Sequence, residues 1–324
     1  MAATAITNIV VPTIFSPYVV EKSATLSNIL SSGIAQRLPA FDELAGSKGK
    51  NFELPYFNDL SGDDEVLGEG SGNKLTVNNI TAEQETAVKL MRGKAFGATD
   101  LAAAVTGEDI MAGIGDMVAT YWSRKTQSAL VNILKGLFDD NAGTNDGVLF
   151  TNHTNDQGST DITSDMVIDT TQKLGDNADK LSGIIMHSAV YAKLQKDSLI
   201  SFIRDADNNI MFSTYLGKRV IVDDSVETSG SGATTQYRSY LFAPGAFAYG
   251  IGAIDNATEV DRDTLAGEDI LINRQHIILH PRGCRWTGSP SGASPTNAEL
   301  ATSTNWSLVF ADENIGVVCL IAGV

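Results

Sequence analysis

The chain has 324 residues, 43% of them apolar, and a formal net charge of −16. This length is enough to bury one large core or two smaller ones, and the composition is globular rather than disordered. A surface this acidic repels nucleic acid and anionic membranes, so tight binding to either is disfavoured.

Neither secretion nor a membrane span is indicated. The N-terminus lacks the basic region and long apolar core of a signal peptide, and no apolar run reaches the length that crosses a bilayer. The two cysteines, Cys284 and Cys319, are flanked by apolar or basic residues. The favoured interpretation is two buried free thiols in a reducing cytoplasm, and a single disulfide is the alternative.

Residues 1–45 are predicted to form an arm. Apolar pairs are mixed there with Ser, Thr and the prolines Pro12, Pro17 and Pro39. Such a segment cannot close a core of its own, so its apolar residues need a partner surface. We expect it to lie over another part of the molecule or over a neighbouring copy, with one short amphipathic helix at Ser23–Leu30.

A hairpin with an acidic tip is predicted next. Asn51–Tyr56 alternates as a strand does, and Lys74–Ile80 and Thr86–Gly97 return with Val, Leu and Phe. A long charged tip has no core to rest on, so Asp59–Gly72 is expected to project onto a neighbouring subunit; the alternative is a mobile surface loop. The tip carries five carboxylates: Asp59, Asp63, Asp64, Glu65 and Glu69. Candidate basic partners on the neighbour are Arg124, Lys125, Arg262 and Arg274.

One long helix is predicted over Glu108–Phe138. Thr106 is a suitable N-cap, and acidic residues follow it in the first turn. Apolar residues then recur with the helical period, so the helix has one side to bury. At about 1.5 Å per residue it would be roughly 45 Å long, and we expect it to act as a beam. The predicted core of its buried side is Ile114, Val118, Trp122, Leu130 and Leu134.

The rest of the chain predicts a compact α/β unit followed by a β-rich segment. The α/β unit consists of a capped helix at Ser164–Leu174, a buried strand at Gly183–His187, a helix at Ser188–Leu199, and strands at Arg219–Val222 and Tyr237–Phe242 separated by an exposed loop at Glu227–Gln236. After it come β-rich Asn256–Trp286, a Ser/Pro/Gly linker at Thr287–Ala298, and an apolar strand pair at Trp306–Val324.

No motif with a catalytic geometry is found in the sequence. His276 and His280 are four residues apart, but Ile277 occupies the place of the general-base Glu in H-E-x-x-H, and the surrounding Ile and Leu favour a strand. Two residues four apart on a strand are roughly 13 Å from each other, too far to share a metal ion. The Gly68–Lys74 run lacks the end of a phosphate loop, and G-x-S-x-G does not occur. We expect no catalytic residue, metal or cofactor; the enzyme alternative is an unfamiliar hydrolase with His187 or His276 as base.

Four segments resemble a known family. They are Gly183–Ser188 with the following Val190, Tyr191 and Leu194; Tyr215–Asp224; Tyr240–Phe247; and Arg274–Trp286. A G-K-R-V-I-V-D-D strand that leads to a loop and then to an L-F-x-P-G-A strand is similar to the coat sequences of tailed bacteriophages. The order of arm, hairpin, long helix, α/β unit and late β segment is similar as well. The chain therefore resembles tailed-bacteriophage major capsid proteins, whose Hong Kong 97-type fold is shared with encapsulins.

The resemblance implies an α+β fold with an N-arm, an extended β-hairpin loop, a peripheral domain with a long spine helix, and an α/β axial domain. Loop Glu227–Gln236 would lie near the centre of a capsomer. No long charged extension precedes the arm, so a scaffolding segment would be a separate protein or one already removed. The implied division is 1–45 N-terminal arm, 46–97 extended hairpin loop, 98–150 peripheral domain with the spine helix, 151–255 axial domain, 256–290 peripheral β segment, and 291–324 C-terminal strands returning to the axial domain.

The function implied by the resemblance is structural rather than enzymatic. The chain would assemble as hexamers and pentamers into an icosahedral phage head in the host cytoplasm and remain in the virion. Double-stranded DNA would be enclosed without specific binding, and no membrane would be involved. Scaffolding, portal and decoration proteins are the further partners implied. The alternative is the shell of an encapsulin-like nanocompartment, which encloses protein cargo.

Overall fold

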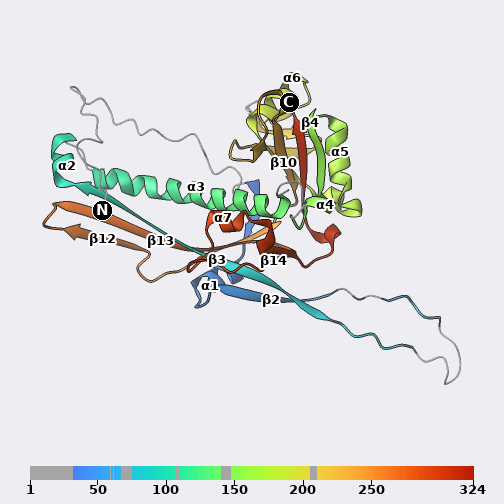
Figure 1. Cartoon of the computed structure of the whole chain (residues 1–324), viewed down its shortest axis with the longest axis horizontal. Helices are drawn as coiled ribbons and strands as arrows, with labels where there is room; N and C mark the ends of the chain where they lie inside the picture. Colours follow the sequence, from blue (N-terminus) through green and yellow to red (C-terminus); the bar gives the residue numbers. More distant parts are fainter. Residues whose placement is uncertain are drawn as a thin grey trace.

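The computed structural model describes residues 32–58, 60, 62–66, 75–106, 110–139, 147–204 and 210–324. Helix α3 (Ile110–Phe138) runs along a sheet of long strands, and its C-terminal end meets a second sheet flanked by shorter helices (Figure 1). A hairpin that begins in the first sheet extends away from the rest of the chain. Within these ranges, no helix is long and apolar enough to cross a membrane.

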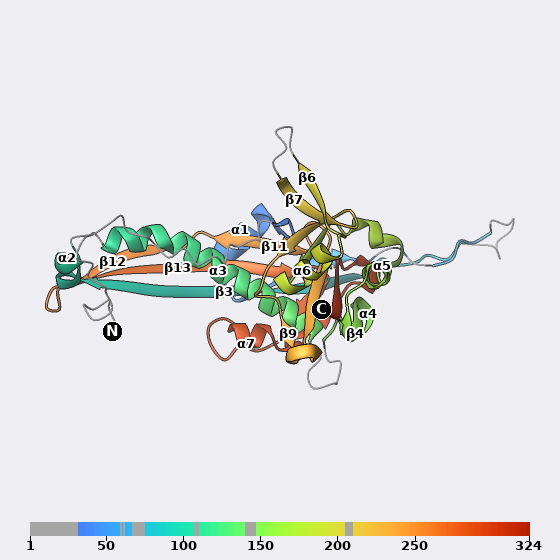
Figure 2. The ribbon, with the colours of Figure 1, turned by 90° about the horizontal axis from the view of Figure 1, so that it is seen from above.

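The first sheet is built on two long antiparallel strands, which pair from Glu268 opposite Thr99 to Ile278 opposite Lys89. Figure 2 shows them side by side beneath α3. In sheet order the strands are β1 (Ala35–Arg37), β11 (Phe247–Gly252), β13 (Glu268–Pro281), β3 (Ala82–Thr99) and β2 (Asn51–Phe57), with β12 (Thr258–Asp263) paired to β13.

The strand expected around His276 and His280 is confirmed as β13, which ends at Pro281. Gly283 turns the chain with φ at +84°, a conformation that glycine adopts without strain. A short second strand, β14 (Cys284–Trp286), then pairs with β15 (Trp306–Leu308). The expected strand pair at the C-terminus is therefore wrong, because β15 pairs with β14 and β16 (Val317–Gly323) enters the second sheet.

The hairpin is formed by β2 and the first part of β3, with Asn51 opposite Val88 and Phe57 opposite Ala82. Beyond the ladder, Asn58 N donates to Thr81 O at 2.9 Å. The strand expected over Lys74–Ile80 is not formed in its described part, 75–80, where no second layer supports a ladder. The distal part of the hairpin projects far from the rest of the chain (Figure 1).

The end of the predicted arm lies on its own chain. β1 pairs in parallel with β11, and α1 (Pro39–Gly46) packs across β11, burying Phe41 and Ala45. Gly250 makes this close approach possible, because a Cβ there would come within 2.4 Å of the Phe41 backbone. Of the two alternatives for the arm, residues 35–46 follow the intramolecular one. The helix expected at Ser23–Leu30 lies outside the described residues.

The expected N-cap of the long helix is wrong. Thr106 is the last residue of a separate helix, α2 (Asp100–Thr106), and residues 107–109 lie outside the described part of the chain. The capping residue occurs earlier: Thr99 Oγ1 accepts from Ala102 N at 3.2 Å. The Leu and Ala residues that follow are strong helix formers, which explains why a helix begins there.

The second sheet is mixed. The cap expected for its first helix is confirmed, and the second helix has a cap that was not expected. Thr163 Oγ1 accepts from Met166 N at 3.4 Å at the start of α5 (Ser164–Gln172), and His187 Nδ1 accepts from Ala189 N at 3.1 Å at the start of α6 (Ser188–Lys196). In sheet order the strands are β4 (Thr154–Asp161), β16, β10 (Gln236–Phe242), β5 (Gly183–Met186), β8 (Lys218–Val222), β7 (Ile210–Tyr215) and β6 (Ser201–Arg204).

Two features of this sheet were not expected. β4 follows the short helix α4 (Phe150–His153) and pairs in parallel with β16, although its residues are polar and do not alternate. The loop expected over Glu227–Gln236 contains a short strand, β9 (Thr228–Ser229), which pairs with β10. Both are edge strands, where a polar sequence costs little because one face or edge meets solvent.

The main core spans both sheets at the C-terminal half of α3. Trp122 is 6% exposed, and Leu130 and Leu134 are fully buried, as predicted. Ile114 and Val118 are only half-buried, so their predicted place in the core is wrong for the single chain. The buried side chains of α3 that the structure describes lie from Trp122 onward, in the part of the helix that packs against α7 (Asn297–Leu300) and the second sheet as well as the first.

Candidate assembly surfaces

The hairpin presents apolar surface that nothing in the described part of its own chain covers. Phe57 is 73% exposed, Val66 95% and Val77 87%. Leu60, Leu75 and Ile80 are exposed as well. A soluble monomer rarely exposes so many large apolar side chains on one element, and such patches mark interaction sites.

The described carboxylates of the acidic tip have two different environments. Glu65 accepts hydrogen bonds from Thr76 N, at 3.0 and 3.3 Å to its two oxygens, which bridges the two arms of the hairpin. This hydrogen bonding lowers the pKa of Glu65. Asp63 and Asp64 are exposed, and within the described ranges neither has a hydrogen-bond or ionic partner. Asp59 and Glu69 lie outside the described residues.

At its base the hairpin is anchored by a buried hydrogen bond between two side chains. Glu85 on β3 is 6% exposed and His280 on β13 is 2% exposed. His280 Nε2 and Glu85 Oε2 are 2.8 Å apart, and the other Glu85 oxygen accepts from Gly283 N at 2.9 Å. Nearby, Lys89 Nζ donates to Ser47 O and lies 5.2 Å from the centre of the Phe52 ring. Both contacts fix the direction in which the hairpin leaves the sheet.

Two of the four expected basic partners are engaged within their own chain. Arg262 pairs with Asp100 at 2.6 Å and with Asp269 at 2.7 Å. Arg274 pairs with Glu259. Their ion pairs hold β12, β13 and the start of α2 together at the end of the first sheet, so their availability for a neighbour's tip is reduced.

The other two candidates, Arg124 and Lys125, lie on α3. Arg124 Nε donates to Thr120 O at 3.4 Å, and Lys125 Nζ lies 5.4 Å from the centre of the Tyr121 ring. Neither has a carboxylate partner among the residues that the structure describes. Both border shallow hollows on this side of the helix.

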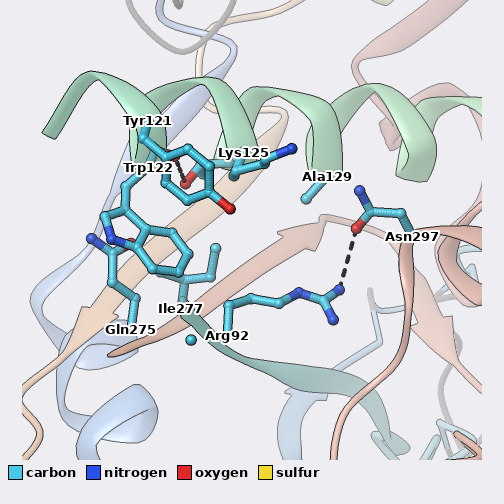
Figure 3. Close-up of a pocket in the computed structure, with 10 residues that line it drawn as sticks. Arg92, Tyr121, Trp122, Lys125, Ala129, Gln275, Ile277 and Asn297 are labelled. Carbon is cyan, nitrogen blue, oxygen red and sulfur yellow. Dashed lines mark hydrogen bonds between the residues drawn. The ribbon is translucent and has the colours of Figure 1, made fainter. Parts of the chain in front are cut away.

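One of these hollows is a pocket of about 160 Å³ between α3 and the first sheet. Tyr121, Trp122 and Lys125 face it from the helix, while Arg92 on β3 and Gln275 on β13 face it from the sheet (Figure 3). The remaining lining residues are Gly93, Thr126, Ala129, Ile277 and Asn297. Trp122 and Lys125 were among the candidate residues named from the sequence, whereas Arg92 and Gln275 were not. In the sequence, these two look like any other polar residues on a strand.

A buried polar joint connects α3 to the second sheet. Arg238 Nη1 donates to Phe138 O at 2.7 Å and lies 3.4 Å from Glu227. Glu227 also pairs with Lys135 at 2.7 Å. One helical face thus carries several contacts to the loops of the second sheet, so the helix and the sheet hold each other in register. Gln127, also on α3, donates a hydrogen bond from Nε2 to Asp223.

The histidines and cysteines serve the packing of the fold. His187 caps α6, and His276 lies on β13, where burial lowers its pKa. Both thiols are free and buried, and burial raises their pKa values, that of Cys319 to about 12. Within the described residues, no group of three or more His, Cys, Asp or Glu side chains is placed to hold a metal ion.

A chain with these surfaces matches a known family over most of its length. A family model described as Gp13-like, major capsid protein 13-like, matches residues 44–317. The major capsid protein of Bacillus phage SPP1 is 40% identical over 333 residues, which cover 98% of each chain. The chain belongs to the Gp13-like family of major capsid proteins.

Solved capsid structures share the fold of this capsid protein. The capsid asymmetric unit of cyanophage Pam1 gives a TM-score of 0.64 at 11% identity, covering 99% of this chain and 98% of that one. The capsid of Ralstonia phage GP4 gives 0.60 at 10% identity, covering 96% and 95%. At such identities the likeness concerns the fold alone. It confirms the α+β fold of Hong Kong 97 type with its extended hairpin and long spine helix.

Proposed function

We propose that this major capsid protein assembles as hexamers and pentamers into an icosahedral shell that encloses double-stranded DNA. The observation that carries the proposal is the projecting hairpin with its exposed Phe57, Val66 and Val77. A monomer leaves this surface in water, whereas a closed shell covers it once for every subunit. Closed symmetry repeats each modest contact many times.

The proposal assigns each segment of the chain to one part of the capsid fold. Residues 1–45 serve as the arm, 46–97 as the hairpin loop over a neighbour, and 98–150 with 256–290 as the peripheral domain around α3. Residues 151–255 form the axial domain, to which 291–324 return. Loop Glu227–Gln236 lies near the capsomer centre. The entry of β16 between β4 and β10 supports the return of the C-terminal strands.

The negative net charge of the protein suits a shell that encloses DNA. With a formal net charge of −16, the inner surface does not bind the packed DNA tightly, so the genome can still leave the shell. We propose no catalytic step for the protein. Scaffolding, portal and decoration proteins are its proposed partners, and assembly takes place in the host cytoplasm before the shell becomes part of the virion. The encapsulin-like alternative rests on the shared fold alone.

The test makes the hairpin polar without changing the carboxylates of its acidic tip. A triple variant, Phe57→Ser, Val66→Ser and Val77→Ser, is compared with the natural protein by sedimentation under conditions that support assembly. We expect fast-sedimenting shells from the natural protein and a shift of the variant to free subunits or capsomers. Val324→Ser, which changes an exposed apolar residue at the C-terminal end, is the matched control. A triple variant that builds shells as well as the control contradicts the role given to the hairpin.

A further inference from the structure

One side of α3 is cationic, although the chain as a whole is acidic. Residues 117–138 contain Arg124, Lys125 and Lys135 and no Asp or Glu, in a chain with 39 acidic residues. Lys135 is neutralised by Glu227 at 2.7 Å. Arg124 and Lys125 have no carboxylate partner in the part of the chain that the structure describes. Their positive charge is therefore available to another molecule.

These two cations border a hollow of about 230 Å³ on the surface of α3, together with Tyr121 and Ser128. The four residues follow the helical spacing i, i+3, i+4 and i+7, so their side chains share one face of the helix. Arg124 uses only its Nε, which donates to a backbone carbonyl of the same helix at 3.4 Å. Ser128 Oγ accepts from Asn297 Nδ2 at 3.4 Å, which leaves the hydroxyl proton of Ser128 free to donate. The Tyr121 hydroxyl has no hydrogen-bond partner within the described ranges.

The donors around this hollow suit a phosphate group. Arg, Lys, Ser and Tyr side chains are among the groups that contact phosphate oxygens in protein–DNA complexes. The volume is below the range of about 300–1,000 Å³ that holds drug-sized ligands and cofactors, so the hollow suits one group of a larger molecule. The pocket beside it shares Tyr121 and Lys125 and contains the half-buried Arg92, so the positive charge continues from α3 to β3 (Figure 3).

The described carboxylates that lie close to α3 are already engaged. Asp223 accepts from Gln127, and Glu299 accepts from Ser291 N at 2.8 Å and from Thr296 N at 2.7 Å. These hydrogen bonds lower the pKa of Glu299 to about 2. The distal hairpin with its acidic tip lies far from α3 of its own chain in both views (Figures 1 and 2). An anion in the hollow must therefore come from outside the described part of the chain.

We propose that the hollow formed by Tyr121, Arg124, Lys125 and Ser128 binds a phosphate group of the enclosed DNA, so that the side of the first sheet that carries α3 faces the lumen. The inference rests on the proposed function, because it needs a shell filled with DNA. Double-stranded DNA carries one negative charge per about 1.7 Å of its axis, which makes it the densest anion inside such a shell. Phosphate contacts do not depend on the base sequence. Two cations per copy, in a chain with a net charge of −16, hold the DNA loosely.

Acylation of lysines in intact particles tests this contact. A small N-hydroxysuccinimide ester transfers its acyl group to a free amine, and mass spectrometry of the digest measures how much of each lysine is modified. Lys125 should be modified several-fold less in DNA-filled particles than in the same particles after their DNA has been released and digested. Lys173, at the end of α5, is the reference and should be modified equally in both.

A variant that keeps the reporting lysine shows whether the hollow is responsible. Arg124→Gln removes one cation, and in DNA-filled particles it should raise the modification of Lys125 towards its level in emptied particles. Arg282→Gln, which changes an exposed arginine just after β13, is the matched control and should leave the protection of Lys125 unchanged.

The outcomes separate DNA from other occupants of the hollow. Equal modification of Lys125 in filled and emptied particles overturns the inference. Protection that persists after the DNA is gone also overturns it, because the hollow is then covered by a neighbouring subunit or by another protein. Equal protection of Lys173 and Lys125 by DNA contradicts a particular site on α3. Particles that never contain DNA contradict the proposed function instead.

Discussion

Arg238 on β10 donates a hydrogen bond from Nη1 to the backbone carbonyl of Phe138, the last residue of α3, at 2.7 Å. The guanidinium thereby caps the C-terminal end of the spine helix, where the backbone carbonyls lack partners and a positive charge is favourable. The two residues are 100 positions apart. Together with the Lys135–Glu227 ion pair, this contact fixes where the helix meets the second sheet.

Replacing Arg238 with Met should loosen that joint. The change keeps the length of the side chain but leaves the Phe138 carbonyl without this donor and removes one partner of Glu227. We expect a loss of about 1–3 kcal/mol in the free energy of unfolding, measured by urea denaturation of the dissociated subunit. Arg238→Lys should lose less, because it keeps the charge. Equal stability of the natural protein and Arg238→Met would show that the cap contributes nothing.

Replacing Glu85 with Ala should destabilise the base of the hairpin. It leaves both His280 and the Gly283 N–H without their buried acceptor. Each stranded group costs about 1–3 kcal/mol, so the midpoint of urea unfolding should fall clearly. Glu85→Gln retains one acceptor and should fall by less. If Ala and Gln cause the same small change, Glu85 is not the anchor of the hairpin.

Trp122→Ala should affect stability and assembly together. Trp122 is 6% exposed at mid-helix, and removing a buried aromatic side chain costs about 3–5 kcal/mol. The melting temperature and the yield of shells should both decrease, because α3 has no other apolar surface that could replace the buried area of Trp122. Trp122→Phe should melt nearly as the natural protein does. Normal melting and normal shells from Trp122→Ala would contradict the role of α3 as a beam.

The stability of the subunit should depend on pH through His153. This residue is fully buried, its Nδ1 donates to Val317 O at 2.8 Å, and desolvation lowers its pKa below the ordinary 6.5. The unfolded chain therefore binds the proton more readily. The contribution of neutral His153 is fully present above pH 6.5 and is lost as the pH falls below it, with a slope of at most about 1.4 kcal/mol per pH unit.

The comparison with His153→Gln isolates this effect, because a Gln amide can donate to the same carbonyl and does not titrate. Urea midpoints measured at pH 7.5 and pH 5.5 should fall more for the natural protein than for the variant. An equal fall in both proteins would assign the pH dependence to other groups.

The elements predictable from sequence are those whose signal is local. The apolar stripe of α3 and the Ile- and Leu-rich β13 carry their own periodicity, and Thr163 stands directly before the helix that it caps. β4 was missed because its partner β16 supplies the apolar surface from more than 150 residues away. Thr106 was predicted to cap the long helix, but it is the last residue of α2, which Thr99 caps. Acidic residues follow both threonines in the sequence, so the local pattern does not distinguish the two.

The candidate sites were predictable only in part, for a similar reason. The acidic tip is contiguous in sequence, so its clustering could be recognised. Arg92, Trp122 and Gln275 come from three elements, and only the fold brings them around one pocket. The pairing of Arg262 with Asp100 also depends on tertiary contact, which explains why a free cation was expected there.

The most direct test of shell assembly is electron microscopy of the purified protein under conditions that support assembly. The proposed function predicts closed particles with icosahedral symmetry, in which each hairpin overlies a neighbouring subunit. A stable monomer under every assembly condition, with Phe57, Val66 and Val77 exposed to water, would contradict it.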